Sequence, residues 1–318
     1  MSRVLVTGIE GFVGQHLARH LREHNHEVIG LHYAPAAAVL AERLYQGDVR
    51  DYAWLKQAVV EARPERIIHL AAVSSVAEAE THVLQTYQIN AVGTLNLIEA
   101  VRLGGIRARV VLVSSADVYG PSTADTPISE ETPLRPLSPY GLSKLAAEEA
   151  CRFSFRAFDT DVVILRSFSH TGPGQSARFL FPTVARRIVE IERAFAASPE
   201  LDETSRTIEL GNLDVKRDYT DVRDIVKAYA LALDGCQAGE TYNVTSGRAV
   251  LIRDGVRSLC DTAHCKVRFT SSAERRRARD LPLLTGSNSK FVQATGWKPD
   301  IPFEQTLADL LGHHRSLA

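Results

Sequence analysis

The segment GIEGFVG, residues 8–14, places three glycines three residues apart, between an apolar run, RVLVTG, and an amphipathic stretch. This pattern predicts a strand that ends at Thr7, a tight turn, and a helix that begins near Phe12. Such a turn brings backbone N–H groups and a helix N-terminus to one point, where they can bind a pyrophosphate. The glycines permit the turn, the close approach of the phosphate, and the packing of the helix on the sheet. The segment therefore predicts a dinucleotide site, and a plain glycine-rich turn is the alternative.

Strand-like apolar runs and helical patterns alternate through the first half of the chain. The further strands expected there are EVIGLH, RIIHLAA, RVVLVSS and DVVILRSF, and the expected helices are 13–24, 52–62, 85–103 and one capped by Ser138 with Pro139 in its first turn. Alternation of this kind means a parallel sheet with helices on both faces. We therefore expect an α/β fold, a Rossmann-like doubly wound parallel sheet with a smaller α/β C-terminal substrate lobe.

The pattern loosens after about Ser169, where polar, Arg-rich and Pro-containing segments are mixed with helices such as 224–233 and 303–311. We expect residues 1–168 plus about 214–240 to form the dinucleotide-binding domain, because the chain returns to it near Asp221. Residues from about 169 to 213 plus 241–318 are expected to form the second lobe, which binds the other substrate.

Charge and composition exclude several kinds of partner. The net charge of −1 creates no field that would attract nucleic acid or an anionic membrane, and no apolar run approaches the roughly 20 residues that a membrane span needs. Because a buried strand already begins at Arg3, we expect no signal peptide. The four cysteines contain no CxxC pair, and the eleven histidines form no cluster at metal-ligand spacing. We therefore expect a cytoplasmic protein with reduced thiols and no metal site.

The second expected strand ends at His32, where an acidic residue would hold the ribose 2′-hydroxyl of NAD. Because His32 brings no negative charge, the position tolerates a 2′-phosphate, so we expect NADP(H) to be favoured and NAD(H) to be accepted. No arginine stands at that position to hold the phosphate, so the preference is expected to be modest. Asp48, in the GDV segment (47–49) ahead of the helix expected over 52–62, is a candidate either for an adenine contact or for a cap of that helix.

Two motifs carry the candidate chemistry. In YGLSK, Tyr140 and Lys144 lie four residues apart and share one face of a helix. An ammonium near a phenol lowers the pKa of the tyrosine, so Tyr140 is expected to exchange a proton with a carbonyl or carbinol near neutral pH. Ser115, in VSSADVYG at the carboxyl end of a strand, can hydrogen-bond the same oxygen. Alone, the Tyr–Lys spacing indicates a surface pair; with the glycine turn and Ser115 it predicts a catalytic set.

These residues together resemble the extended short-chain dehydrogenases/reductases, in the branch that modifies nucleotide sugars. The resemblance covers nearly the whole chain and rests on the glycine turn, HLAA at His69, Asn90, Ser115, Tyr140, Lys144 and TGWKP at Thr295. Within this branch, RSFSHTGPGQ (166–175), followed by GNLDVKRDYTDVRD (211–224), is most similar to the reductases of GDP-4-keto-6-deoxy-D-mannose. Ser167 replaces their proline and Ser169 replaces their asparagine, which weakens a polar contact expected near the sugar or diphosphate.

The resemblance implies an NAD(P)H-dependent reduction of the C4 keto group of a GDP-4-keto-6-deoxy sugar, from GDP-4-dehydro-6-deoxy-D-mannose to GDP-D-rhamnose. The related dehydratases carry a glutamate where this chain has Asp117, or an aspartate where it has Ala116, and both differences favour reduction. A turn-stabilising role is the alternative for Asp117. For the whole chain, a 4,6-dehydratase or epimerase, a talo-forming or 4-keto-heptose reductase, and a non-catalytic dinucleotide-binding scaffold stay open.

The resemblance also implies the site residues. The expected catalytic residues are Ser115, Asp117, Tyr140 and Lys144. The expected cofactor-binding residues are Gly8, Gly11, Phe12, Val13, Gly14, His32, Asp48, Val49, Leu70, Ala71, Ala72, Asn90, Ser114, Tyr140, Lys144 and Phe168. The expected substrate-binding residues are Ser75, Asp117, Ser169, Arg178, Arg217 and Arg277. The arginines would meet the diphosphate, although the run ERRRAR around Arg277 is alternatively a solvated charged face.

We also expect a homodimer, because relatives pack the helix pair 85–103 and 139–155 against its copy as a four-helix bundle with two-fold symmetry. Leu95, Ile98, Leu145 and Phe153 are the candidate contact residues. The alternative is that these side chains only face the sheet.

Overall fold

The computed structural model describes residues 2–34, 39–121, 126–272 and 282–317 of the 318-residue chain. The chain forms two compact units. The first comprises Met1–Phe168, Ile225–Val244 and Ser287–Lys298, and the second comprises Ser169–Asp224, Thr245–Gly286 and Pro299–Ala318. The chain passes from one unit to the other repeatedly, so neither unit is a continuous piece of sequence.

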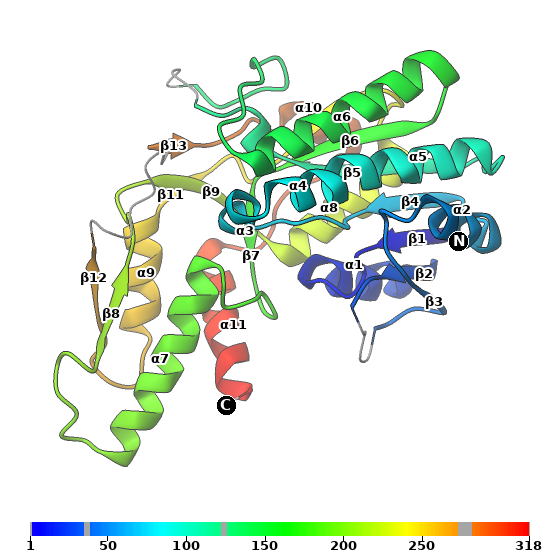
Figure 1. Cartoon of the computed structure of the whole chain (residues 1–318). Coiled ribbons are helices and arrows are strands. Elements are labelled where there is room, and N and C mark those ends of the chain that lie inside the picture. Colours follow the sequence, from blue (N-terminus) through cyan, green and yellow to red (C-terminus); the bar gives the residue numbers. More distant parts are fainter. Residues whose placement is uncertain (1, 35–38, 122–125, 273–281, 318) are drawn as a thin grey trace. The chain divides into compact units, whose positions relative to one another are not determined.

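The first unit is built on a parallel sheet of seven strands in the order β10-β6-β5-β4-β1-β2-β3 (Figure 1). The strands are β1 (Arg3–Thr7), β2 (Glu27–His32), β3 (Arg43–Gln46), β4 (Arg66–His69), β5 (Arg109–Ser115), β6 (Val162–Ser167) and β10 (Thr241–Val244). All neighbouring strands pair in parallel. The strand order reverses between β1 and β4, where Thr7 pairs with His69. Ligands of such sheets bind outside the carboxyl ends of the strands at this switch point.

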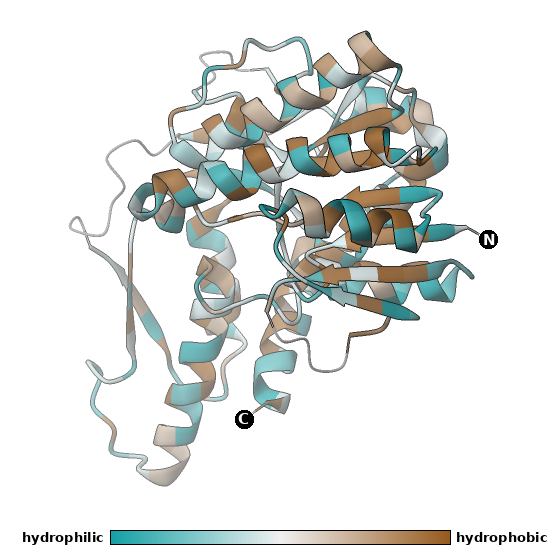
Figure 2. Ribbon diagram, turned by 45° about the vertical axis from the view of Figure 1, so that its right-hand side comes forward, coloured by the Kyte–Doolittle hydropathy of each residue, from teal (hydrophilic) through white to brown (hydrophobic). Residues whose placement is uncertain are grey.

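Helices connect these strands, which confirms the expected doubly wound α/β fold. They are α1 (Phe12–Glu23), α2 (Tyr52–Ala62), α3 (Val76–Thr81), α4 (Val83–Tyr87), the π-helical turn η1 (Gln88–Val92), α5 (Gly93–Leu103), the 3₁₀ turn η2 (Ala116–Val118), α6 (Pro139–Phe158), α8 (Val222–Gly235) and α10 (Ser289–Thr295). Apolar side chains of α2, α5 and α6 share one buried core with the sheet. Figure 2 shows that apolar residues make up most of the inner strands of this sheet.

One expected helix start is confirmed, whereas one helix expected to be continuous is divided. The Ser138 hydroxyl accepts the N–H of Gly141 at 3.0 Å, with Pro139 in the first turn, so the expected start of α6 is confirmed. The single helix expected over 85–103 is instead α4, η1 and α5 in succession. A π-helical turn inserts one extra residue into a helix and often lies at a functional site, and here it contains the buried Asn90.

The second unit contains smaller sheets and three helices in the described residues. They are β7 (Ser169–Thr171), β8 (Thr207–Leu210), β9 (Lys216–Asp221), β11 (Ala249–Leu251), β12 (Arg268–Ser271), β13 (Leu283–Leu284), α7 (Leu180–Ala197), α9 (Ile252–Asp261) and α11 (Phe303–Ser316). β9 pairs with β7, β11 and β13, and β8 pairs with β12. Side chains of α7, α9 and α11 form the core of this unit. Over the described ranges of the chain, no helix combines the length and apolarity that crossing a membrane requires.

Two segments placed in the second lobe by the sequence pattern belong to the first unit. Residues 241–244 form β10, which pairs with β6 at the edge of the central sheet. Residues 287–298 join the same unit, because the Phe291 ring packs against Tyr242 and Trp297 with ring centroids 6.1 and 5.6 Å apart. Lys290 also pairs with Glu240 at 2.7 Å.

Candidate active site

Backbone atoms of neighbouring segments pack tightly around the glycine turn. Gly8 has φ +66°, in the left-handed region, and its N–H donates to the Leu31 carbonyl at 2.9 Å. A Cβ on Gly8 would lie 3.0 Å from the backbone of Ala71, and one on Gly14 would lie 2.5 Å from the Gly8 carbonyl. Within the described chain, α1 begins at Phe12 without a side-chain cap from Gly11, and the N-terminus of a helix favours a negatively charged ligand. This cradle fits the pyrophosphate of a dinucleotide.

A buried polar chain holds β1, β4 and α5 together behind the turn. His69 Nδ1 lies 2.7 Å from the Thr7 hydroxyl, and Nε2 lies 3.1 Å from the Thr94 hydroxyl. Because Thr94 donates its own proton to the Asn90 carbonyl at 2.6 Å, Nε2 must carry the imidazole hydrogen and Nδ1 must accept from Thr7. Burial, and then the charge of Lys144, lowers the pKa of His69 to about 3, so the ring is neutral.

Strand β5 delivers Ser115 to the carboxyl end of the sheet. Its hydroxyl accepts the N–H of Asp117 at 3.1 Å and begins η2. A Cβ on Gly141 would lie 2.6 Å from the Asp117 carbonyl, so the first turn of α6 packs directly against this segment. Ser115, Asp117 and Tyr140 are therefore brought together.

Tyr140 is buried among apolar side chains of the first unit. Burial raises the pKa of Tyr140 above its usual range, the Asp117 carboxylate raises it further, and a hydrogen bond with Ser115 acts in the opposite direction. The expected lowering of this pKa by Lys144 is therefore wrong for the protein by itself. The physical reason is that loss of hydration disfavours the phenolate more than the neighbouring groups favour it.

Lys144 is buried one helical turn after Tyr140. Its Nζ donates to the Val113 carbonyl of β5 at 2.7 Å. Burial lowers the pKa of Lys144 to about 8, and the Glu148 carboxylate works against that shift. At neutral pH the side chain is therefore mostly an ammonium, held at the strand end that carries Ser115.

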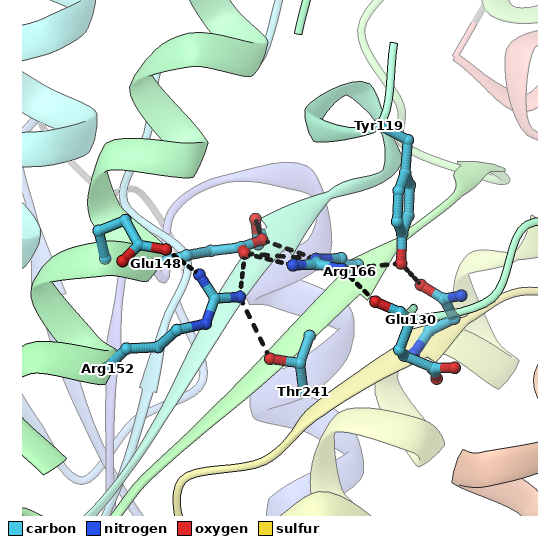
Figure 3. A network of polar contacts seen from close by, with 9 residues as sticks. Tyr119, Glu130, Glu148, Arg152, Arg166 and Thr241 are labelled. Carbon is cyan, nitrogen blue, oxygen red and sulfur yellow. Dashed lines mark hydrogen bonds and ion pairs between the residues drawn. The ribbon is translucent and has the colours of Figure 1, made fainter. Parts of the chain in front are cut away.

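A buried charge network joins α6 to the sheet (Figure 3). The Glu148 carboxylate accepts hydrogen bonds from Arg166 at 2.8 Å, from Arg152 at 2.6 Å and from the Ser114 hydroxyl at 2.6 Å. Arg166 also donates to the Tyr119 hydroxyl at 3.0 Å. Burial alone would raise the pKa of Glu148, but the hydrogen bonds and charge of Arg166 hold it below its usual range. The network fixes α6 against the strand that ends at Ser115.

Asn90 shapes the site from the π-helical turn. Its amide NH₂ donates to the Val73 carbonyl at 3.1 Å and to the Ser143 hydroxyl at 2.9 Å, and its oxygen accepts the Val73 N–H at 2.8 Å. Both amide hydrogens are therefore used inside the protein. Asn90 therefore holds the segment after β4 against α6, and its expected contact with a cofactor stays a prediction.

His32 and Asp48 lie at the ends of β2 and β3. His32 Nδ1 lies 2.9 Å from a backbone carbonyl two residues on. Asp48 accepts from Arg50 Nη2 at 2.5 Å, and this hydrogen bond lowers the pKa of Asp48. The residue that caps α2 is Asp51, so the helix-cap interpretation of Asp48 is wrong. The Asp48 carboxylate instead forms an ion pair with Arg50.

The remaining cofactor candidates lie near the same strand ends or in the core beside them. Phe12 and Val13 begin α1, Val49 follows β3, Leu70, Ala71 and Ala72 follow β4, and the buried Phe168 follows β6. The Ser114 hydroxyl donates its proton to Glu148, so Ser114 could meet a cofactor only as a hydrogen-bond acceptor or through its backbone.

The substrate candidates are divided between the units. Ser75, in the first unit, caps α3 with its hydroxyl. In the second unit, Ser169 on β7 and the half-buried Arg217 on β9 lie on adjacent strands, and the exposed Arg178 precedes α7. Arg277, with the run ERRRAR, lies outside the described residues.

The sequence pattern did not single out Glu148 or Arg166, although both are buried in the network. One signal was present, because Glu148 follows Lys144 by four residues and therefore shares its helix face. Arg166 gives no comparable signal, since it meets Glu148 from a separate strand.

Comparisons with known proteins match the chain over its whole length. The family model described as GDP-mannose 4,6 dehydratase matches residues 5–310. The GDP-6-deoxy-D-mannose reductase of Pseudomonas aeruginosa is 35% identical over 316 residues, which cover 99% of this chain and 98% of that protein. The solved structure of RMD from Pseudomonas aeruginosa complexed with NADPH has a TM-score of 0.87 at 33% identity and covers 100% of both chains. The UDP-glucose 4-epimerase of Thermus thermophilus, solved in complex with NAD, has a TM-score of 0.86 at 27% identity, covering 99% of this chain and 100% of that chain.

Proposed function

We propose, from the premise that this chain belongs to the GDP-mannose 4,6-dehydratase family, that it reduces the C4 keto group of GDP-4-dehydro-6-deoxy-D-mannose and forms GDP-D-rhamnose. The observation that carries the proposal is the 35% identity with a GDP-6-deoxy-D-mannose reductase along nearly the full length of both proteins. The site geometry supports it, because a protonated tyrosine contacts a serine hydroxyl at the end of β5, and an ammonium lies against β5 two residues before that serine.

The cofactor is an NAD(P)H dinucleotide, with NADP(H) favoured over NAD(H). The glycine cradle and the uncapped start of α1 would hold its pyrophosphate. When bound, the nicotinamide supplies the hydride that C4 receives. The preference is supported by His32 in the place of an acidic residue and by the NADPH in the solved structure of RMD.

The side chains then complete the reduction. Tyr140, kept neutral by burial, donates its proton to the C4 oxygen as that oxygen gains electron density. Ser115 hydrogen-bonds the same oxygen, and the Lys144 ammonium stabilises the phenolate that the transfer leaves on Tyr140. Solvent returns the proton to the phenolate. One hydride and one proton thus convert the ketone into an alcohol.

The second candidate is a dehydratase or epimerase that keeps its cofactor bound. Such an enzyme first oxidises C4, so its tyrosine must begin as a base. Burial works against that, because it raises the pKa of Tyr140. Asp117 also lacks one methylene of the glutamate expected in dehydratases.

Recognition of the GDP portion is assigned to the second unit. Arg217 and Arg178 supply positive charge on β9 and before α7, and arginine can meet phosphate oxygens with two parallel hydrogen bonds. Ser169 lies on the strand adjacent to Arg217 and offers a hydroxyl. We propose the same role for Arg277, outside the described residues. In the first unit, Ser75 and Asp117 are the proposed contacts to the sugar.

A homodimer is proposed through α5 and α6. Leu95 and Phe153 are 43% and 55% exposed on these helices, which supports a role in burying apolar surface against a second copy. Ile98 is fully buried in the core instead, and Leu145 is half-buried. Sedimentation of the wild type should give a dimer, and the double variant Leu95→Asp/Phe153→Asp should give a 35.0 kDa monomer.

The cytoplasm is the proposed location. The thiols of Cys151, Cys236, Cys260 and Cys265 are free, which is the state that a reducing compartment maintains. Fractionation of cells that express the protein tests this placement.

The direct test of the function uses GDP-4-dehydro-6-deoxy-D-mannose and NADPH. A reductase should oxidise one NADPH for every GDP-D-rhamnose formed. Turnover of nucleotide sugar without net loss of NADPH would instead identify a dehydratase or an epimerase.

A further inference from the structure

Glu10 is the charged side chain inside the glycine turn, between Gly8 and Gly11. Its Oε1 accepts the backbone N–H of Tyr33 at 2.8 Å and that of Ala34 at 3.4 Å. These two residues directly follow His32, where β2 ends. The glycine turn therefore places a carboxylate against the end of β2, although the sequence of β2 itself ends without an acid.

The charge of this carboxylate is only partly compensated. Its Oε2 is shielded from solvent and has no hydrogen-bond partner among the residues that the structure describes. Arg50, which follows β3, directs its guanidinium to Asp48 at 2.5 Å. His32 directs Nδ1 to a backbone carbonyl. A ligand bound beside the end of β2 is therefore exposed to a negative potential from Glu10.

In dinucleotide-binding sheets the end of β2 is where the adenosine ribose is recognised. NAD has a hydroxyl at the ribose 2′ position, and NADP has a phosphate there. The N–H groups of Tyr33 and Ala34 would be natural donors to that phosphate, but Glu10 already uses them. A carboxylate at this place repels a 2′-phosphate and tolerates a hydroxyl.

We propose that Glu10 is a specificity-determining residue that weakens the binding of dinucleotides with a 2′-phosphate and so keeps NADH usable. The proposal rests on the proposed function for the class of ligand, and concerns only how strongly one form is preferred. His32 leaves room for the 2′-phosphate, while Glu10 limits the advantage that NADPH gains from it.

The test measures the dissociation constants of NADPH and NADH by fluorescence titration, without any sugar. Glu10→Gln preserves the shape and one carbonyl acceptor for the Tyr33 N–H while it removes the charge. It should tighten NADPH binding roughly tenfold, the scale of one unit-charge repulsion in a partly solvated site, and change NADH binding by less than about twofold. The same contrast should appear between 2′,5′-ADP and 5′-AMP, which differ only in the 2′-phosphate. High salt should reduce the effect, because it screens charge.

Two controls separate this claim from others. Glu23→Gln removes an equal charge at the far end of α1 and should leave both constants unchanged. Glu10→Ser gives a second, smaller uncharged side chain, in case the glutamine variant folds poorly. A ratio of the two constants that stays within twofold of wild type in both Glu10 variants overturns the proposal, even if the protein reduces the keto sugar. A ratio that shifts as expected supports it, even if no keto sugar is turned over.

Discussion

The two units hold their candidate residues in different ways. In the first unit, Ser115, Tyr140 and Lys144 are 9%, 9% and 5% exposed, and backbone contacts with β5 and η2 position the serine and the lysine. In the second unit, Arg217 is half-buried and Arg178 is exposed. Groups that move a proton or orient a carbonyl must be aligned before the ligand arrives, whereas charges that attract a diphosphate act over a longer distance. The contrast matches the roles proposed for these residues, which are reaction chemistry in the first unit and substrate binding in the second.

Removing the Tyr140 hydroxyl tests the role proposed for the buried residues of the first unit. Of the changes considered, it should have the largest effect on turnover. Tyr140→Phe is expected to lower the turnover number by about 10²–10⁴, the usual contribution of a general acid, with the dissociation constant of NADPH within twofold of wild type. Steady-state kinetics and fluorescence titration measure the two quantities. Tyr52→Phe is the matched control, because the Tyr52 hydroxyl has no hydrogen-bond partner in the described ranges. Turnover of Tyr140→Phe within a few fold of wild type would remove this residue from the reaction.

Removing an arginine from the second unit should have a smaller and more selective effect. Arg217→Ala is expected to raise the dissociation constant of GDP by about 10- to 100-fold, because a hydrogen bond to a charged group contributes about 1.5–3 kcal/mol. NADPH affinity should stay the same, and Arg217→Lys should restore only part of the loss. Calorimetric titration with each ligand tests this, with Arg257→Ala on the exposed face of α9 as the control. A dissociation constant of GDP equal to that of the wild type would show that Arg217 does not bind the diphosphate.

The buried His69 gives the first unit an acid sensitivity that the exposed residues of the second unit do not share. Its pKa is about 3 in the folded state and about 6.5 in the unfolded state, so the unfolded chain binds more protons between these values. Stability should therefore fall as pH falls through this window, by about 1.3 kcal/mol per pH unit near pH 5 from this residue.

Amide hydrogen exchange in β1 and β4 as a function of pH measures this effect. His69→Asn should remove the contribution of one proton from the slope of unfolding free energy against pH. An identical pH slope in wild type and His69→Asn would mean that the histidine is not held neutral.

The sequence predicted those parts of the site that depend on local spacing. The glycine turn, the strand–helix alternation and the shared face of Tyr140 and Lys144 all lie within a few residues of chain, where periodicity is informative. The start of α6 at Ser138 is another such feature, and the structure confirms it.

Features created by contacts between distant segments could not be obtained in this way. The sign of the Tyr140 pKa shift depends on burial, which the spacing to Lys144 does not reveal. Glu148 meets Arg166 only because α6 packs on β6, and residues 287–298 return to the first unit through ring contacts of Phe291. Asp48 pairs with Arg50, only two residues away. The sequence left a helix cap open for Asp48, and the structure assigns that cap of α2 to Asp51 instead.

The most direct test of the proposed reduction follows the hydride itself. The protein is incubated with GDP-4-dehydro-6-deoxy-D-mannose and NADPH that carries deuterium in the transferred position, and the product is analysed by NMR. The expected result is GDP-D-rhamnose with one deuterium at C4 for each NADPH oxidised. A nucleotide-sugar product without deuterium at C4, or no product while NADPH stays intact, would contradict the assignment of this chain as a C4 reductase.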